Sequence, residues 1–160
     1  MTSPDAPVSI RAAEFDDLPD VLKLLRCLNP QDLHAPAEKH HETFERMLNL
    51  PGLTVFLAHL GSKAVATCTL MVIPNLTRGS SPFALIENVV THPDVRGQGI
   101  GRQLITAVCD NAWKEGCFKI MLLSGTQNEK AHRFYEQMGF QTTKKGFELR
   151  RPGFPVRRPT

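Results

Sequence analysis

Two β-type runs separated by only two residues constrain this chain most strongly. Residues 54–60 and 63–73 are rich in β-branched and apolar side chains, and Gly61-Ser62 between them is typical of a hairpin turn. A connection this short joins antiparallel neighbours. The sequence therefore predicts that an antiparallel hairpin forms part of the sheet.

Further strands and helices are predicted on both sides of this hairpin. The predicted strands are residues 8–12, 54–60, 63–73, 83–91, 120–123 and 147–150. The predicted helices are residues 18–28, 37–50, the segment from Gly101 to Gly116, and 127–138. Residues 74–82 are expected to form a polar loop. This order predicts an α/β or α+β fold, in which helices pack on a mixed, mostly antiparallel sheet.

Length and composition fit one globular domain over residues 1–160. A chain of 160 residues that is 41% hydrophobic and 22% charged buries a core without needing a disulfide or a metal. Residues 1–7 and the Pro/Arg-rich segment 151–160 are expected to be tails. No apolar run approaches the roughly 20 residues of a membrane span, and the first seven residues lack the features of a signal peptide. A cytoplasmic protein without a membrane partner is therefore expected.

Charge, cysteine and histidine patterns exclude several classes of site. A net charge of +3 demands no nucleic-acid partner, and the basic tail with Arg157-Arg158 is expected to be solvated. Adjacent helical residues point about 100° apart, so His40-His41 cannot share a metal ion, and no metal site is expected. The four cysteines form no C-x-x-C pair and are predicted to be reduced core residues; they are Cys27, Cys68, Cys109 and Cys117.

A glycine-rich stretch at residues 95–102 lies between a predicted strand and an amphipathic helix. Three glycines within five positions let a ligand approach the backbone, and free N–H groups at a helix start favour an anion. Arg96 and Arg102 add positive charge at the same turn. The stretch matches neither a P-loop nor the G-x-G-x-x-G fingerprint. It predicts a phosphate-binding turn, with a plain glycine-rich turn as the alternative.

Two sequence blocks resemble the GNAT superfamily of acetyl-CoA-dependent N-acetyltransferases. Arg96-x-x-Gly99-x-Gly101 is similar to the pyrophosphate loop of that family, Arg/Gln-x-x-Gly-x-Gly/Ala. The motif N-x-x-A-x-x-F-Y-E-x-x-G-F, which begins at Asn128, looks like the helix that the family places beside the pantetheine of CoA. The resemblance is sharp from residue 83 to residue 140 and general over the N-terminal half.

The resemblance implies a GNAT fold with acetyl-CoA as the acetyl donor. Strands 83–91 and 119–123 would splay apart at a bulge. The pantetheine arm would pair with the backbone at Val89-Val90. The residues implied to bind the cofactor are Val89, Val90, Arg96, Gly97, Gln98, Gly99, Ile100, Gly101, Arg102, Asn128 and Phe134. The resemblance leaves a homodimer open.

Two side chains are candidates for the chemistry of acetyl transfer. An alkyl ammonium must lose a proton before it attacks, and Glu87, a carboxylate in an otherwise apolar run, would act as the base or hold a water. The alternative for Glu87 is a solvent-facing strand residue, and strand alternation is expected to point its neighbour Asn88 to the opposite face. Tyr135 would protonate the departing CoA sulfur, or it would belong to an ordinary core stripe with Ala131 and Met138.

The predicted activity is acetyl transfer from acetyl-CoA to a primary amine of a small molecule, by direct attack in a ternary complex. Residues 86–90, 116–120 and 146–150 are similar to the glucosamine-6-phosphate N-acetyltransferases, although Asn88 stands where those enzymes usually carry Asp. Two alternatives remain open at this point. The first is an acetyltransferase acting on a protein N-terminus or lysine, and the second is a non-catalytic acyl-CoA-binding sensor.

Overall fold

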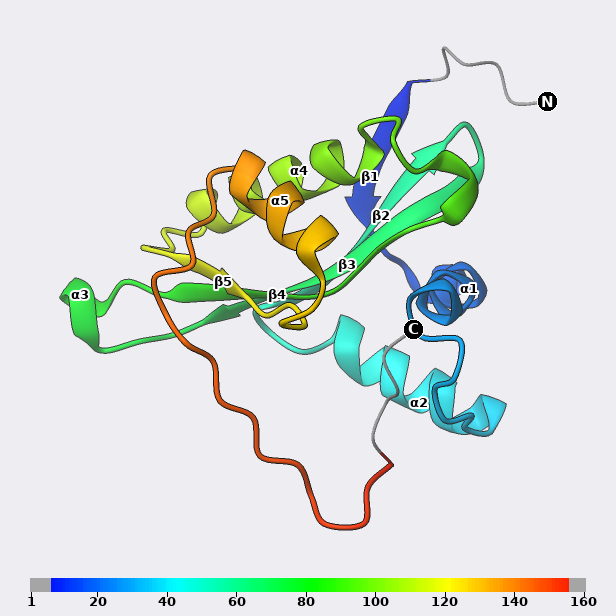
Figure 1. Ribbon diagram of the computed structural model, residues 1–160. Coiled ribbons are helices and arrows are strands. Elements are labelled where there is room, and N and C mark those ends of the chain that lie inside the picture. Colours follow the sequence, from blue (N-terminus) through cyan, green and yellow to red (C-terminus); the bar gives the residue numbers. More distant parts are fainter. Residues whose placement is uncertain (1–6, 156–160) are drawn as a thin grey trace. The chain divides into compact units, whose positions relative to one another are not determined.

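The computed structural model describes residues 7–155 (Figure 1). The expectations for residues 1–6 and for the end of the tail, including Arg157-Arg158, lie outside these described residues. The chain divides into two compact units, residues 1–121 and 122–160, called here the first unit and the second unit.

The first unit is built on a sheet with the strand order β1-β2-β3-β4-β5. Its strands are β1 (Val8–Ala12), β2 (Leu53–Leu60), β3 (Lys63–Ile73), β4 (Phe83–Thr91) and β5 (Ile120–Leu122), and the last residue of β5 belongs to the second unit. The first four strands are antiparallel neighbours, and the predicted hairpin is confirmed because Leu60 pairs with Lys63. β5 runs parallel to β4, so the sheet is mixed, as predicted.

Two backbone hydrogen bonds connect the start of β4 with the residues just before β5. They follow the same order along the two segments, as in a parallel pair. The Phe118 N–H donates to the Pro82 carbonyl at 2.9 Å, and the Ala84 N–H donates to the Lys119 carbonyl at 3.0 Å. β5 has three residues and β4 has nine. β5 therefore pairs with the beginning of β4, and β4 continues well beyond it.

Helices cover both faces of the sheet in the first unit (Figure 1). α1 (Leu18–Leu28) and α2 (Ala37–Leu48) lie on one face, and α4 (Ile100–Lys114) lies on the other. Three short helical segments connect the larger elements; they are η1 (Phe15–Asp17), α3 (Thr77–Ser80) and η2 (Pro93–Val95). Among the described residues, no helix combines the length and the apolar character needed to cross a membrane.

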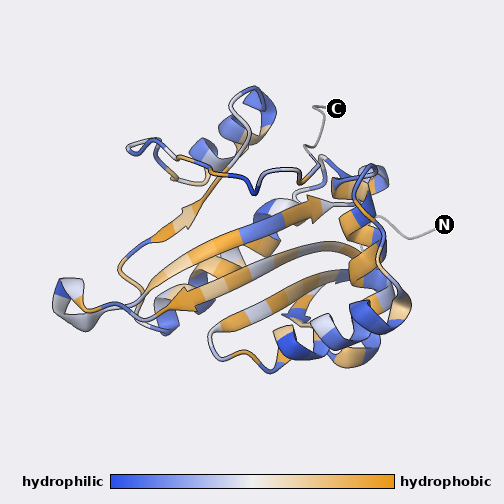
Figure 2. Cartoon of the chain, turned by 90° about the horizontal axis from the view of Figure 1, so that it is seen from below, coloured by the Kyte–Doolittle hydropathy of each residue, from blue (hydrophilic) through white to orange (hydrophobic). Residues whose placement is uncertain are grey.

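Covering both faces explains why β2 and β3 read as nearly continuous apolar runs. Figure 2 shows the central strands coloured mainly as hydrophobic. The core on the side of α1 and α2 contains Ala13, Leu18, Val21, Leu24, Phe44, Val55, Leu57, Ala64 and Val90. On the other face α4 buries Ile100, Leu104, Ile105, Val108 and Ala112, whose spacing is that of one helical stripe. The two cores fix the helices on either side of the strands.

The predicted strand at residues 147–150 is wrong, because no strand forms there. Phe147 is 89% exposed and Leu149 is fully exposed, so neither face of the segment packs on a core. Glu148 instead accepts a hydrogen bond at 2.6 Å from Arg150. Alternating apolar residues form a strand only when a neighbouring strand pairs with their backbone, and local sequence does not supply that neighbour.

Three smaller expectations also change. The predicted helix 37–50 ends at Leu48, because Asn49 caps it by donating its side-chain amide to the Glu45 carbonyl at 2.8 Å. The predicted loop 74–82 contains the short α3, in which Arg78 and Gly79 have left-handed backbones. Cys68 and Cys117 are buried as predicted, whereas Cys27 and Cys109 are only half-buried on α1 and α4.

Candidate functional site

β4 carries a β-bulge at Asn88. Glu87 pairs with Thr69 and Val90 pairs with Thr67, so three steps along β4 face only two steps along β3. Asn88 adopts φ 55°, a left-handed backbone that asparagine tolerates better than most residues. The extra residue places Glu87 and Val90 on the same face of the sheet, the face covered by α1 and α2.

The bulge overturns the expectation for Asn88. Strict alternation points Asn88 away from the face that carries Glu87, but alternation holds only along a regular strand. Asn88 instead lines a pocket together with Thr67 and Thr69, and Thr69 is the residue paired with Glu87. Glu87 itself is exposed to solvent rather than enclosed by the apolar residues of its strand.

The pocket lies within the first unit, between α1, α2 and the sheet, and has a volume of about 390 Å³. Its walls are mainly apolar side chains of the two helices, and its floor contains Val55, Thr67, Thr69 and Asn88. The Thr67 hydroxyl donates to the Phe56 carbonyl at 2.8 Å, which satisfies it within the sheet. Sequence reasoning expected that the helix at residues 37–50 could border a substrate cleft, but it did not predict the pocket floor. The signal for the floor was the pair of threonines, two residues apart, within the apolar run of β3.

The glycine stretch forms an open turn at the start of α4. Gly97 and Gly99 have φ angles of 79° and 77°, the left-handed region that favours glycine. A Cβ atom added at either glycine would meet nothing within 4 Å, so no packing accounts for the two glycines. Their side of the backbone is open to an approaching ligand.

The backbone donors of this turn are those of a helix N-terminus. Gly99 is the N-cap of α4, and the first bond inside the helix runs from the Gln103 N–H to the Gly99 carbonyl at 3.0 Å. The N–H groups of residues 100–102 thus precede the helical ladder, and the helix dipole makes this end attractive to anions. Ile100, only 2% exposed, anchors the turn in the core.

Two arginines place positive charge at the same turn. Arg96 and Arg102 are both exposed. The Arg96 Nε donates to the Thr91 carbonyl at 3.0 Å, which ties the turn to the last residue of β4. β4 therefore leads from the pocket floor at Asn88, through the half-buried Val89 and the buried Val90, to the short η2 and then to a basic helix N-terminus.

The remaining predicted residues lie in the second unit, on or beside α5 (Glu129–Gln137). Asn128 caps this helix, because its Oδ1 accepts a hydrogen bond from the Ala131 N–H at 3.1 Å. The half-buried Tyr135 ring contacts Phe134 and Phe140 edge to face, at centroid distances of 5.1 and 5.7 Å. Tyr135 thus belongs to an aromatic cluster of its own unit, and the structure gives Asn128 a capping role that sequence reasoning had not assigned.

Sequence comparisons with known proteins match this chain to acetyltransferases. The sequence profile of the Acetyltransferase (GNAT) family matches residues 18–140. A glucosamine 6-phosphate N-acetyltransferase of Trypanosoma brucei brucei is 36% identical over 91 residues, which cover 57% of this chain. The aligned part spans 60% of that relative's own length.

Solved structures show the same fold. A putative acetyltransferase from Agrobacterium tumefaciens superposes with a TM-score of 0.86 and 44% identity, over 89% of this chain and 99% of that one. An aminoglycoside N-acetyltransferase in complex with CoA has a TM-score of 0.77 and 23% identity, over 91% and 95% of the two chains. The second likeness shows the fold alone.

Proposed function

Because the chain belongs to the acetyltransferase (GNAT) family, we propose that it transfers an acetyl group from acetyl-CoA to a primary amine of a small molecule. The observation that carries the proposal is the course of β4. This strand connects a pocket floor at Asn88 with a basic, glycine-lined helix N-terminus at residues 96–102. The chain that leaves this strand therefore links a proposed place for an acceptor to a proposed place for phosphates.

The glycine turn is proposed to bind the pyrophosphate of acetyl-CoA. The residues in this role are Arg96, Gly97, Gln98, Gly99, Ile100, Gly101 and Arg102. Support comes from the open space beside the left-handed Gly97 and Gly99, from the helix N-terminus and from the two exposed arginines. When bound, acetyl-CoA supplies the acetyl group as an activated thioester.

Four further residues are proposed to hold the rest of the cofactor. Val89 and Val90 would pair with the pantetheine arm through their backbone, and the burial of the Val90 side chain agrees with a backbone role. Asn128 and Phe134 are proposed from the motif that begins at Asn128. Because the Asn128 Oδ1 caps α5, Asn128 would contact the cofactor through its amide nitrogen Nδ2.

Glu87 is proposed to take the proton from the acceptor ammonium, directly or through a water. At neutral pH this deprotonation costs roughly 4 kcal/mol for an alkyl amine, so a nearby carboxylate accelerates the reaction. The pairing of Glu87 with Thr69 supports this role, since it places the carboxylate on the sheet face that forms the pocket floor. Tyr135 is proposed to give a proton to the departing sulfur, and the family motif supports that role.

The size of the pocket supports a small-molecule acceptor. Its volume of about 390 Å³ lies within the ~300–1,000 Å³ of small-molecule sites. The test is a panel of primary amines and lysine peptides, incubated with acetyl-CoA and the full chain and scored by CoA release. Acetylation of small amines is expected. Acetylation of peptides alone would indicate a protein acetyltransferase, and acetyl-CoA binding without any turnover would indicate a sensor.

A further inference from the structure

We infer that the acceptor carries an apolar body, an alkyl or aryl group, which fills the pocket between α1, α2 and the sheet; this inference rests on the function proposed above. It departs from the sugar phosphate and the aminoglycosides named for proteins of similar fold. It is based on the chemical character of the residues that line the pocket.

Apolar side chains make up most of the pocket wall on α1, and on α2 they lie beside His40 and Thr43. The lining side chains from these helices include Leu18, Val21, Leu22, Leu25, Phe44 and Met47. The four from α1 fall on one helical face, and Phe44 and Met47 fall three residues apart on α2. Leu22, Leu25 and Met47 are only half-buried, so part of their surface remains accessible to a ligand. An apolar ligand would remove this surface from water, which favours binding.

The polar groups of the pocket floor are neutral. The floor contains Thr67, Thr69 and Asn88 and no charged side chain. The Thr67 hydroxyl already donates its proton to the Phe56 carbonyl, so it can offer a ligand only an acceptor. A phosphorylated sugar buried here would leave hydroxyl groups against leucine and methionine side chains without partners, which is unfavourable.

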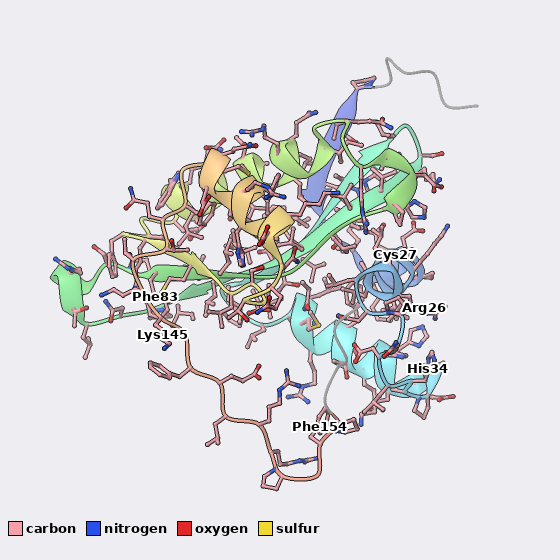
Figure 3. The ribbon with its side chains drawn as sticks, in the orientation of Figure 1. Arg26, Cys27, His34, Phe83, Lys145 and Phe154 are labelled. Carbon is pink, nitrogen blue, oxygen red and sulfur yellow. The ribbon has the colours of Figure 1, made fainter. Side chains whose placement is uncertain are left out.

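The charged lining residues lie away from the floor, at the end of α1, in the segment after it and on α2. Arg26 and Asp32 are exposed, as is His34, while His40 of α2 is half-buried. Figure 3 shows Arg26 at the end of α1 and His34 in the segment that follows. The same segment contributes Leu33, which is 61% exposed and also lines the pocket, so apolar surface extends outward. A polar substituent would fit at this outer part, and an apolar one in the body of the pocket.

The bulge sets the orientation of the acceptor. Glu87 lies on the sheet face of Thr69, so the amine would lie at the β4 end of the pocket floor. The apolar body would then extend between α1 and α2. This orientation predicts that selectivity depends on the substituent beyond the amine-bearing carbon.

The experiment uses the full chain with acetyl-CoA and two sets of acceptors. The first set is n-alkylamines from propylamine to octylamine together with 2-phenylethylamine, and the second is glucosamine, glucosamine 6-phosphate and an aminoglycoside. We expect kcat/KM to rise about threefold to fourfold with each added CH₂ until the pocket is full. We also expect 2-phenylethylamine to exceed glucosamine 6-phosphate at least 10-fold. Equal or better turnover of the polar set overturns the inference and leaves the proposed function intact.

Calorimetry of the same amines separates this inference from the proposed function. Absence of turnover with every amine contradicts acetyl transfer, and the binding series then decides the inference alone. Tighter binding of longer alkylamines supports an apolar acceptor pocket. Affinity that does not change with chain length overturns it.

Two neighbouring residues of α2 provide a matched pair of variants. Met47 and Leu48 are both half-buried and both pack against the core, but only Met47 lines the pocket. Met47→Gln is expected to lower kcat/KM for hexylamine about 10-fold, mainly through KM, with a smaller effect on glucosamine. Leu48→Gln should leave the chain-length dependence unchanged. If Met47→Gln does not fold, Leu22→Gln on α1 makes the same test, and an unchanged preference in a folded lining variant contradicts the inference.

Discussion

Glu87 of β4 is paired with Thr69 of β3, and Thr69 lines the pocket between α1, α2 and the sheet. The pairing holds although Asn88 interrupts β4 immediately afterwards with a left-handed residue. A carboxylate and the pocket floor therefore share one face of the sheet. Most of the functional predictions depend on this relationship and on the glycine turn that follows β4.

Glu87→Gln should lower kcat about 100-fold at pH 7, because the amide keeps the shape of the side chain but cannot accept the ammonium proton. Activity should recover partly at high pH, where more of the amine is already neutral. The measurement is a pH–rate profile from pH 6 to pH 10 with the best amine of the panel. Glu42→Gln, an exposed glutamate on α2, is the control. A Glu87→Gln profile that overlays the wild type would assign deprotonation to solvent.

Gly99→Val should weaken acetyl-CoA binding at least 10-fold, because the branched side chain fills the open side of the turn and disfavours its left-handed backbone. Calorimetry with acetyl-CoA measures the change. Gly61→Val is a matched control, since Gly61 also has a positive φ and no neighbour within 4 Å, but it lies in the β2–β3 turn. Equal affinities in the two folded variants would remove the glycine turn from the cofactor site.

Tyr135→Phe should reduce turnover roughly 10- to 1000-fold while acetyl-CoA affinity stays near normal. The phenyl ring preserves the edge-to-face contacts with Phe134 and Phe140, and only the hydroxyl is lost. Steady-state kinetics and calorimetry on the same preparation separate the two effects. Weakened binding with unchanged kcat would show that Tyr135 acts only in packing.

Asp17 should make stability depend on pH in the acid range. The Arg11 guanidinium donates two hydrogen bonds to its carboxylate, at 2.6 and 2.8 Å, and lowers the pKa of Asp17 to about 2; the Glu14 N–H adds a third at 2.7 Å. Because the folded pKa lies below the ordinary value, this stabilisation is present at neutral pH and is lost as the pH falls from about 5 to about 2.

Asp17→Asn tests this contribution. Arg11 is partly exposed, so solvent screening limits the expected loss at pH 7 to about 1–2 kcal/mol. Urea unfolding at several pH values should also show a flatter dependence between pH 5 and pH 2 in the variant. Asp16→Asn, the exposed neighbour, should change little. An unchanged slope in Asp17→Asn would mean that other groups control acid unfolding.

Local patterns were enough to predict the elements that depend on nearby residues. The Gly61-Ser62 hairpin, strand 83–91 and the glycine turn before α4 all follow from turn residues and periodicity within short windows. The strand predicted at residues 147–150 had the same kind of pattern. It is absent because strand formation depends on a partner elsewhere in the chain, which a window of four residues cannot reveal.

The site was only partly predictable for the same reason. Glu87 and residues 96–102 stand out because a charge interrupts an apolar run and glycines cluster at a helix start. The pocket is assembled from α1, α2 and β3, which are distant in sequence, and its floor depends on a bulge at Asn88. The family resemblance implies a bulge where strands 83–91 and 119–123 separate, but β4 contains no glycine or proline that would place it at Asn88 and so show which residues change face.

The helical part of the pocket wall and the glycine turn come from separate parts of the sequence. The helical part, from Leu18 to Met47, is one uninterrupted stretch of the chain, while the glycine turn begins only at residue 96. A mutagenesis library confined to residues 18–47, or an exchange of that segment with a relative, would remodel the pocket and leave the sequence of the glycine turn unaltered. Evolution can therefore diversify one part of this protein while the other stays constant.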